Sequence, residues 1–384
     1  MSILIFLKKK IEGSIFDKIL RYSINFISPC YYAFTKKIVK SKKIHFVFIC
    51  YGGLGDCVLT LPFLLELSSK YKVSVFIEEK FKDINCLLNE NIEVRSYTKK
   101  NLLSELKFFG ARNSNFILIQ QSPIMEFILF NLCLQRPTTI GFIYTQNLIS
   151  CEGIDLKNKK IISVNKISKY KSILKIVSSI ENKIFSEERY KNFDNINKIF
   201  DDRNMIKQKY FLISPTKNHN WNSGFLELKT YANFLIKISL KTSLVPVIIG
   251  SKEDSLIINK IINYIPKEIN YLNLVGKTTI KNLISLICGA NFVVANDNGI
   301  HHLSNFLNTR TLTLYNFSSY KVYDWSKKTS KYIFNPVFQC MPCVGNTNGP
   351  FDNYPFKCPW FFRCKDTIKE DEIIRKIEDE NWIN

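Results

Sequence analysis

The sequence holds two successive series of short apolar strands, each strand followed by a helical segment. The first series opens with the apolar run 44–50, a glycine-rich turn and a helix over 57–70, and further strands are expected at 73–77, 92–96, 116–120 and 138–142. In the second series, strands are expected at 210–214, 244–249, 272–275, 292–295 and 310–315, with helices at 225–240, from 255, at 278–287 and at 299–307. Alternation of buried strands with helices is typical of parallel sheets covered on both faces. The pattern therefore predicts an α/β fold with two Rossmann-like, doubly wound lobes that face a central cleft.

We divide the chain into four parts on this basis. Residues 1–43 form a basic amphipathic extension, residues 44–205 the N-terminal lobe, residues 206–367 the C-terminal lobe with a cysteine-rich tail loop, and residues 368–384 a C-terminal helix. Residues 155–205 are rich in Lys, Asn and Ile, and we expect helices and the inter-lobe link there. The last helix, within 365–384, is expected to pack on a lobe through apolar side chains, namely Ile368, Ile373, Ile374, Ile377 and Trp382.

The net charge of +21 indicates anionic partners, such as nucleic acid, an anionic membrane surface or a phosphorylated glycan. Zinc-finger spacing, an RNP-type aromatic strand and basic-zipper heptads are all missing from the sequence, so we expect no nucleic acid. Residues 1–43 interleave basic and apolar side chains at near-helical spacing. Such a segment either lies on an anionic membrane surface or packs on the domain with a solvated basic face. No apolar run approaches the ~20 residues of a membrane span, and the N-terminus does not read as a signal peptide, so we expect a cytoplasmic protein.

The first glycine-rich turn places an acid at the start of a helix. Gly52, Gly53 and Gly55 lack a Cβ, so their backbone can approach a ligand closely, and Asp56 follows them at the carboxyl end of the first strand. Open α/β sheets bind their ligands at this edge. The structural alternative for Asp56 is an acid in the first turn of the helix, favoured by the helix dipole.

The corresponding turn in the second lobe is the stretch NFVVANDNGIHHL, Asn291 to Leu303. Asp297 or Asn298 can cap a helix that begins near Gly299. The N-terminus of a helix attracts phosphate, and His301 and His302 lie in the first turn of this one. The alternative is a capped structural turn with two surface histidines.

Four cysteines near the C-terminus have the spacing C-x2-C-x14-C-x5-C: Cys340, Cys343, Cys358 and Cys364. The first pair and the long gap suit a structural zinc site. The alternatives are buried thiols in a packed loop and pairs that oxidise readily.

Three motifs, in order, resemble glycosyltransferase family 9, the bacterial heptosyltransferases of lipopolysaccharide core assembly. The first is ICYGGLGDCVLTLPFLLEL (49–67), which is similar to the family's opening strand, loop, Gly-Asp and helix. The second is LVGKTTIKNLISLICGANFVVANDNGIHHLSNFLNTRTLTLY (274–315), which is similar to the family's stretch with the pattern D-T-G-x-x-H-L-A. The third is the cysteine tail, and the resemblance covers about residues 44–368.

The resemblance implies a GT-B fold and inverting, metal-independent transfer from a nucleotide sugar, usually ADP-heptose, to a lipid-linked saccharide such as a lipopolysaccharide core. It implies a peripheral protein at the inner face of the bacterial inner membrane, with no cofactor needed for catalysis. The family's general base corresponds to Asp56, and an acceptor hydroxyl does need a carboxylate within hydrogen-bond reach. Residues at the family's donor-binding positions are Asp297, Asn298, Gly299, His302 and Glu253; His301 is then expected to be an ordinary surface residue.

The sequence departs from the family at two donor positions. Asn298 stands where the family has Thr, and His219 stands where it commonly has a Lys two residues before a Trp. Lys217, or protonated His219, is expected to contact the donor phosphate instead. Two alternatives remain: a GT-B enzyme that uses another nucleotide sugar for capsule or O-antigen, and a non-catalytic protein that binds nucleotide sugars or glycans.

Overall fold

The computed structural model describes residues 45–50, 53–98, 100–102, 104–105, 206–216, 226–318, 320, 325, 328–338, 340–342 and 362–383. It also describes the backbone of four strands between residues 117 and 165. Several residues and segments singled out by the sequence lie outside the described residues: the extension 1–43, Gly52, Lys217, His219, Cys343 and Cys358.

The N-terminal lobe contains a sheet with the strand order β3-β2-β1-β4-β5-β6-β7. Its strands are β1 (His45–Cys50), β2 (Lys72–Glu78), β3 (Ile92–Tyr97), β4 (Ile117–Ser122), β5 (Thr138–Tyr144), β6 (Ser150–Asp155) and β7 (Lys160–Asn165). Strands β1 to β5 pair in parallel, whereas β6 and β7 join antiparallel. The helix α3 (Leu54–Ser68) follows β1, and the 3-10 segment η1 (Glu79–Leu87) follows β2.

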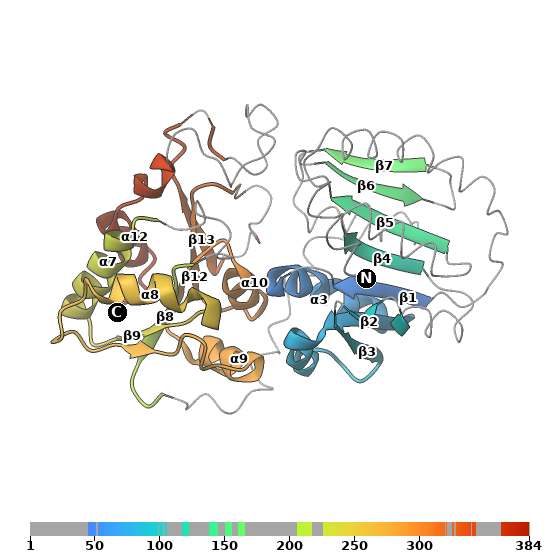
Figure 1. Cartoon of the computed structure of the whole chain (residues 1–384), viewed down its shortest axis with the longest axis horizontal. Coiled ribbons are helices and arrows are strands. Elements are labelled where there is room, and N and C mark those ends of the chain that lie inside the picture. Colours follow the sequence, from blue (N-terminus) through green and yellow to red (C-terminus); the bar gives the residue numbers. More distant parts are fainter. Residues whose placement is uncertain are drawn as a thin grey trace.

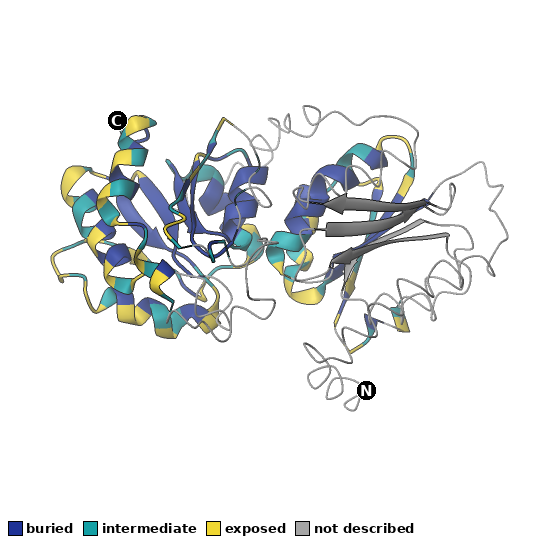
Figure 2. Cartoon of the chain, turned by 90° about the horizontal axis from the view of Figure 1, so that it is seen from above, coloured by how far each residue is buried: buried dark blue, intermediate teal, exposed yellow. Residues whose placement is uncertain are grey.

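The C-terminal lobe contains a parallel sheet with the order β10-β9-β8-β11-β12-β13. Its strands are β8 (Tyr210–Ser214), β9 (Val245–Ile248), β10 (Leu272–Asn273), β11 (Val293–Asn296), β12 (Thr311–Tyr315) and β13 (Ser330–Phe334). The helical segments are α7 (Leu228–Lys241), η4 (Lys252–Asp254), α8 (Ser255–Ile262), α9 (Ile280–Gly289), α10 (Gly299–Phe306), η5 (Arg363–Asp366) and α12 (Glu370–Asp379). Every residue of β8, β9, β11 and β12 is buried, as in a sheet covered on both faces (Figure 2).

In both sheets the strand order reverses beside the first strand, which is where doubly wound folds bind ligands. In the N-terminal lobe this point lies between β1 and β4, and the chain leaves β1 into the turn before α3. In the C-terminal lobe it lies between β8 and β11, and the chain leaves β11 into the turn before α10. The two turns singled out by the sequence therefore sit at the switch points of the two sheets.

Several elements differ from the prediction, among them two strands at sheet edges. Lys160–Asn165, expected to belong to helices or the inter-lobe link, is strand β7, paired with β6 in an antiparallel hairpin. Ser330–Phe334, for which no element was predicted, is edge strand β13. Both strands lie at the outer edge of their sheet, where pairing with a neighbour decides the conformation more than apolar patterning does.

The C-terminal helix packs as its apolar residues predicted. Ile373, Ile374 and Ile377 of α12 are buried together with Ile368 and Trp382. On the exposed side, α12 is joined to α7 by ion pairs, with Lys237 Nζ 2.8 Å from Asp371 and Lys241 Nζ 2.7 Å from Glu378. The helix itself is shorter than the predicted 365–384 range.

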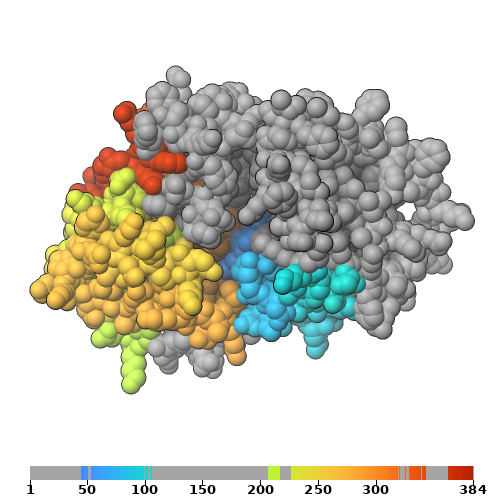
Figure 3. Space-filling model, viewed as in Figure 1, coloured from blue at the N-terminus to red at the C-terminus, as the bar shows by residue number. Residues whose placement is uncertain are grey.

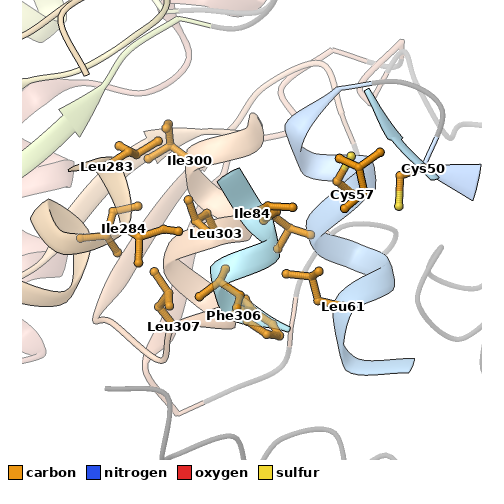
Figure 4. Close-up of a cluster of buried hydrophobic side chains, with 14 of the residues drawn as sticks. Cys50, Cys57, Leu61, Ile84, Leu283, Ile284, Ile300, Leu303, Phe306 and Leu307 are labelled. Atoms are coloured by element: carbon orange, nitrogen blue, oxygen red, sulfur yellow. The ribbon is translucent and has the colours of Figure 1, made fainter. Parts of the chain in front are cut away.

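A buried apolar cluster joins the two lobes. Helices α3 and α10 lie side by side between the two sheets (Figure 1), and the coloured atoms of the two lobes meet in the space-filling view (Figure 3). The close-up in Figure 4 shows Leu61 of α3 and Ile84 of η1 facing Leu303 and Phe306 of α10. Each of these four side chains is at most 1% exposed, so the inter-lobe contact has the character of a protein core.

Candidate active site

The start of α3 is organised by Asp56. The backbone N–H of Gly53 donates to Asp56 Oδ2 at 2.9 Å, so the carboxylate holds the residue before the helix against its first turn. Asp56 is half-buried, so its carboxyl group remains within reach of solvent. Asp56 therefore meets both expectations from the sequence. It is an acid in the first turn of α3, and it lies at the switch point of the sheet.

Cys57, the residue after Asp56, is not a candidate for a nucleophile. A hydrogen bond with Cys50 and complete burial raise the pKa of the Cys57 thiol well above its usual value. A thiol with a raised pKa holds its proton and is a poor nucleophile. Tyr97 Oη donates to the carbonyl of Cys50 at 2.8 Å and so fixes the end of β1 just before the turn.

The start of α10 is capped by Asn298, not by Asp297. Asn298 Oδ1 accepts the N–H groups of Ile300 and His301 at 2.9 and 3.1 Å. Its Nδ2 donates to Ser214 Oγ at 2.9 Å and to the carbonyl of Thr216 at 2.7 Å, and so ties α10 to the end of β8. Asparagine can do both because its amide accepts and donates. Asn298 thus accepts the N–H groups of the second and third residues of the helix. It does not accept the N–H of the first residue, Gly299.

Asn296, at the end of β11, is held by a buried tyrosine. Tyr231 Oη donates to Asn296 Oδ1 at 2.9 Å and accepts the N–H of Leu226 at 2.8 Å. Burial raises the pKa of Tyr231, so the phenol stays neutral. The residue before Asp297 is thus held in place by a buried, neutral tyrosine.

Asp297, His301 and His302 form a buried cluster. Asp297 Oδ1 lies 3.6 Å from His301 Nδ1 and 3.8 Å from His302 Nε2. His301 Nε2 lies 3.3 Å from Tyr315 Oη, and the indole Nε1–H of Trp325 donates to His302 Nδ1 at 3.0 Å.

The prediction of His301 as an ordinary surface residue is wrong, since its exposure is 0%. Helix α10 has no exposed face: all residues from Ile300 to Phe306 are buried between β12, α9 and α3. A surface position would have required a helix with one solvated side.

Among the described residues, the ligand atoms of Asp297, His301 and His302 all lie within 4.8 Å of one another. Carboxylate and imidazole groups at such spacing make either a metal site or a hydrogen-bonded cluster. The position of the proton on the His302 ring bears on this choice.

The two turns meet across the lobe interface. A Cβ added to Gly55 would lie 2.6 Å from His302 Cδ2, and one added to Gly299 would lie 2.8 Å from Leu54 Cβ. The missing Cβ of Gly55 therefore makes room for a side chain of the other lobe. Asp56 is the next residue after Gly55, so the candidate base and the candidate donor-binding histidine come from neighbouring positions of one site.

The remaining predicted residues are placed as follows. Gly53 is exposed, with open space where a Cβ would stand. Glu253 is exposed in η4, directly after β9, the strand next to β8. Its neighbour Asp254 is the one that caps the turn, since Asp254 Oδ2 accepts the N–H of Ser251 at 2.8 Å. The roles of Lys217, His219 and Gly52 stay predictions.

Sequence reasoning missed Trp325, Tyr315, Ser214 and Thr216. Tyr315 ends a strand that was predicted, and Ser214 ends another, so their positions at the carboxyl edge of the sheet were available as a signal. Trp325 stands alone in the polar stretch SSYKVYDWSKK, and nothing in its spacing points to His302.

Comparison with known proteins agrees with the fold. Residues 178–352 match the family model of glycosyltransferase family 9 (heptosyltransferase). The lipooligosaccharide heptosyltransferase 2 of Campylobacter jejuni is 22% identical over 338 residues, which is 85% of this chain and 95% of that protein.

Two solved structures from Escherichia coli share the architecture. Heptosyltransferase WaaC with ADP is 13% identical, covers 88% of this chain and 99% of its own, and has a TM-score of 0.62. The iron-containing dodecameric glycosyltransferase TibC is also 13% identical, covers 88% of this chain and 76% of its own, and has a TM-score of 0.56. The prediction of a GT-B fold is confirmed by these similarities and by the two doubly wound sheets. The chain is therefore similar to glycosyltransferase family 9 over residues 178–352, and it has the GT-B fold of the solved heptosyltransferases.

Proposed function

We propose that the protein transfers heptose from ADP-heptose to a lipopolysaccharide core or a related lipid-linked glycan, with Asp56 as the general base. The observation that carries this proposal is the contact of Gly55 with the ring of His302, which brings the acid of the first lobe beside the donor motif of the second. The donor is supported by the relatives: WaaC has been solved with ADP-2-deoxy-2-fluoro heptose, and TibC in complex with ADP-D-beta-D-heptose.

The proposed reaction is a single displacement at the anomeric carbon. Asp56 accepts the proton of the acceptor hydroxyl as its oxygen attacks from the face opposite the leaving group. The bond from the anomeric carbon to the diphosphate oxygen breaks, and ADP leaves with the negative charge. The N-terminus of α10, His302 and the basic residues Lys217 and His219 stabilise that charge. We propose that these groups stabilise the leaving ADP without a metal ion.

A panel of ADP-, UDP-, GDP- and CDP-sugars in a thermal-shift assay tests the donor. A ligand at 100 times its dissociation constant adds about 2.7 kcal/mol of stability, so we expect ADP-heptose to raise Tm by several degrees and the other sugars to have little effect. Stabilisation by a different nucleotide sugar would favour the enzyme of capsule or O-antigen assembly. Stabilisation by none would favour a non-catalytic role.

We propose that the protein is peripheral on the inner face of the inner membrane, where a lipid-linked acceptor lies. The support is the net charge of +21 and the basic, amphipathic composition of residues 1–43. In the part of the chain that the structure describes, no helix is long and apolar enough to cross a bilayer.

Binding to anionic liposomes tests the membrane proposal. We expect full-length protein to sediment with them at low salt and less at high salt, and deletion of residues 1–40 to abolish sedimentation. Retained binding by the deletion variant would show that the extension is not the anchor.

We propose a structural metal at the four cysteines of the tail. Cys364 is buried and Cys340 is half-buried, and thiolate sets of this kind hold zinc or iron. The iron-containing relative TibC makes both metals worth measuring.

Metal analysis of purified protein is expected to find about one equivalent of zinc or iron per chain. Cys340→Ser and Cys364→Ser should lose it, whereas the matched control Cys86→Ser, a half-buried thiol of the N-terminal lobe, should keep it. A wild-type protein free of both metals would rule out the site.

A further inference from the structure

We infer that Trp325 fixes His302 as an Nε2–H donor that points toward Asp297 and the nucleotide-sugar site, so that His302 acts as a hydrogen-bond donor and not as a metal ligand. The effect on the donor sugar rests on the proposed function. The protonation state of His302 does not, because it follows from the contacts of the described residues alone.

The indole Nε1 of Trp325 lies 3.0 Å from His302 Nδ1. An indole nitrogen can donate a hydrogen bond but cannot accept one. His302 Nδ1 must therefore offer its lone pair, and in the neutral imidazole the proton is then on Nε2.

The Nε2 side of the His302 ring faces the junction of the lobes. His302 Nε2 lies 3.8 Å from Asp297 Oδ1, and the ring lies against Gly55 of the other lobe. The second histidine, His301, lies beside it, with ring centroids 4.2 Å apart. The Nε2–H bond thus projects into the junction of the two switch-point turns, where the leaving diphosphate is proposed to lie.

Metal binding by this cluster would require the lone pair of His302 Nε2. Of the two ring nitrogens of His302, Nε2 is the one near Asp297 and His301. With a proton on Nε2, that lone pair is not available. A ligand histidine normally donates its other N–H outward, whereas here the outward nitrogen receives a hydrogen bond from Trp325.

Packing holds Trp325 in this orientation. Its indole contacts the ring of Phe306 edge-on, with centroids 6.4 Å apart, and it packs against the apolar cluster that joins the lobes. Trp325 is therefore a positioning residue: it orients a side chain of the site through one hydrogen bond, from a segment that follows β12.

Nitrogen-15 NMR of the full-length protein labelled at histidine tests the inference directly. The protein has four histidines, so the imidazole region is simple, and His302→Gln assigns the signal of interest. His45 serves as a neutral reference because burial, with a contribution from Lys72, lowers its pKa to about 4. At pH 8 we expect His302 to carry its proton on Nε2 and none on Nδ1. A proton on Nδ1 would overturn the inference.

The variant Trp325→Phe removes the indole N–H and keeps an aromatic ring. We expect the Nδ1 resonance of His302 to move, and those of His45 to stay in place. The matched control Trp382→Phe makes the same chemical change in the core of the C-terminal lobe and should leave His302 unchanged. A wild-type His302 signal in Trp325→Phe would contradict the assignment of Trp325. Zinc added in excess of the one equivalent proposed for the tail cysteines should not shift the His302 nitrogens, and a coordination shift at Nε2 would overturn the inference.

Activity separates this inference from the proposed function. In Trp325→Phe we expect kcat for transfer to fall by about 10-fold or more, with a smaller change in KM, because an oriented donor acts mainly on the charge that develops in the transition state. Trp382→Phe should keep the wild-type kcat. If wild-type protein shows the predicted tautomer but transfers no heptose, the proposed function fails and the inference stands. If wild-type protein transfers heptose but carries the proton on His302 Nδ1, the proposed function stands and the inference fails.

Discussion

Asp56→Asn is expected to lower kcat for sugar transfer by about 100-fold to 10,000-fold, the range that a positioned general base supplies. Asparagine has nearly the same shape as aspartate and keeps an oxygen that can accept the N–H of Gly53, but it cannot take the proton of the acceptor hydroxyl. The cap of α3 depends on that same contact, at 2.9 Å. The asparagine variant therefore separates the chemical role of Asp56 from its structural role.

Asp56→Ala is the comparison. It removes both the base and the cap, and loss of a helix cap costs about 1 kcal/mol. We expect both variants to lose activity equally, but only the alanine variant to lose stability in urea unfolding. Wild-type turnover in Asp56→Asn would show that another group takes the proton.

Gly55→Ala is expected to damage both the lobe interface and catalysis. The new Cβ would lie 2.6 Å from His302 Cδ2, whereas carbon atoms pack at about 3.5 to 4.0 Å. The His302 ring is buried and held by Trp325, so α3 and α10 must separate instead. Overpacking of this kind costs about 1–3 kcal/mol, and a displacement near 1 Å between reacting groups can cost about 100-fold in rate.

The same substitution would otherwise stabilise the protein. Gly55 lies inside α3, where alanine is favoured over glycine by about 1 kcal/mol. Gly53→Ala is the matched control for the free energy of unfolding, because no atom lies within 4 Å of its added Cβ and its φ of −90° suits alanine. If Gly55→Ala is more stable than wild type by urea unfolding, the close contact of the lobes is absent in solution.

The sequence predicted the parts of the fold whose signal is local. Strand β8 was predicted at its observed position because a fully buried strand reads as an apolar run. The start of α8 at Ser255 was predicted from the turn residues that precede it. The hairpin of β6 and β7 was missed, since Ser150–Asp155 and Lys160–Asn165 become strands by pairing with β5 and with each other. Local patterning cannot show such a partner.

In the candidate site, too, the features set by local sequence could be predicted and those set by tertiary contacts could not. Asp56 and the Asp297 to His302 stretch follow strand ends, so their place at the switch points could be predicted. The burial of His301 could not, because it depends on β12 and α3 covering both sides of α10. Neither could the hydrogen bond of Trp325 to His302, which joins a polar loop to a helix 23 residues earlier in the chain. The glycines show a third case: the lack of a side chain at Gly55 was predicted to admit a ligand, and it accommodates His302.

The most direct test of the proposed function is transfer itself. Purified full-length protein is incubated with ADP-heptose and a heptose-deficient lipopolysaccharide core. The mass of the acceptor is measured by mass spectrometry, and the release of ADP is measured in parallel. We expect the acceptor to gain one heptose residue for each ADP released, with Asp56→Asn as the inactive control. An acceptor of unchanged mass with ADP-heptose, together with a mass gain from another nucleotide sugar, would contradict the proposed donor.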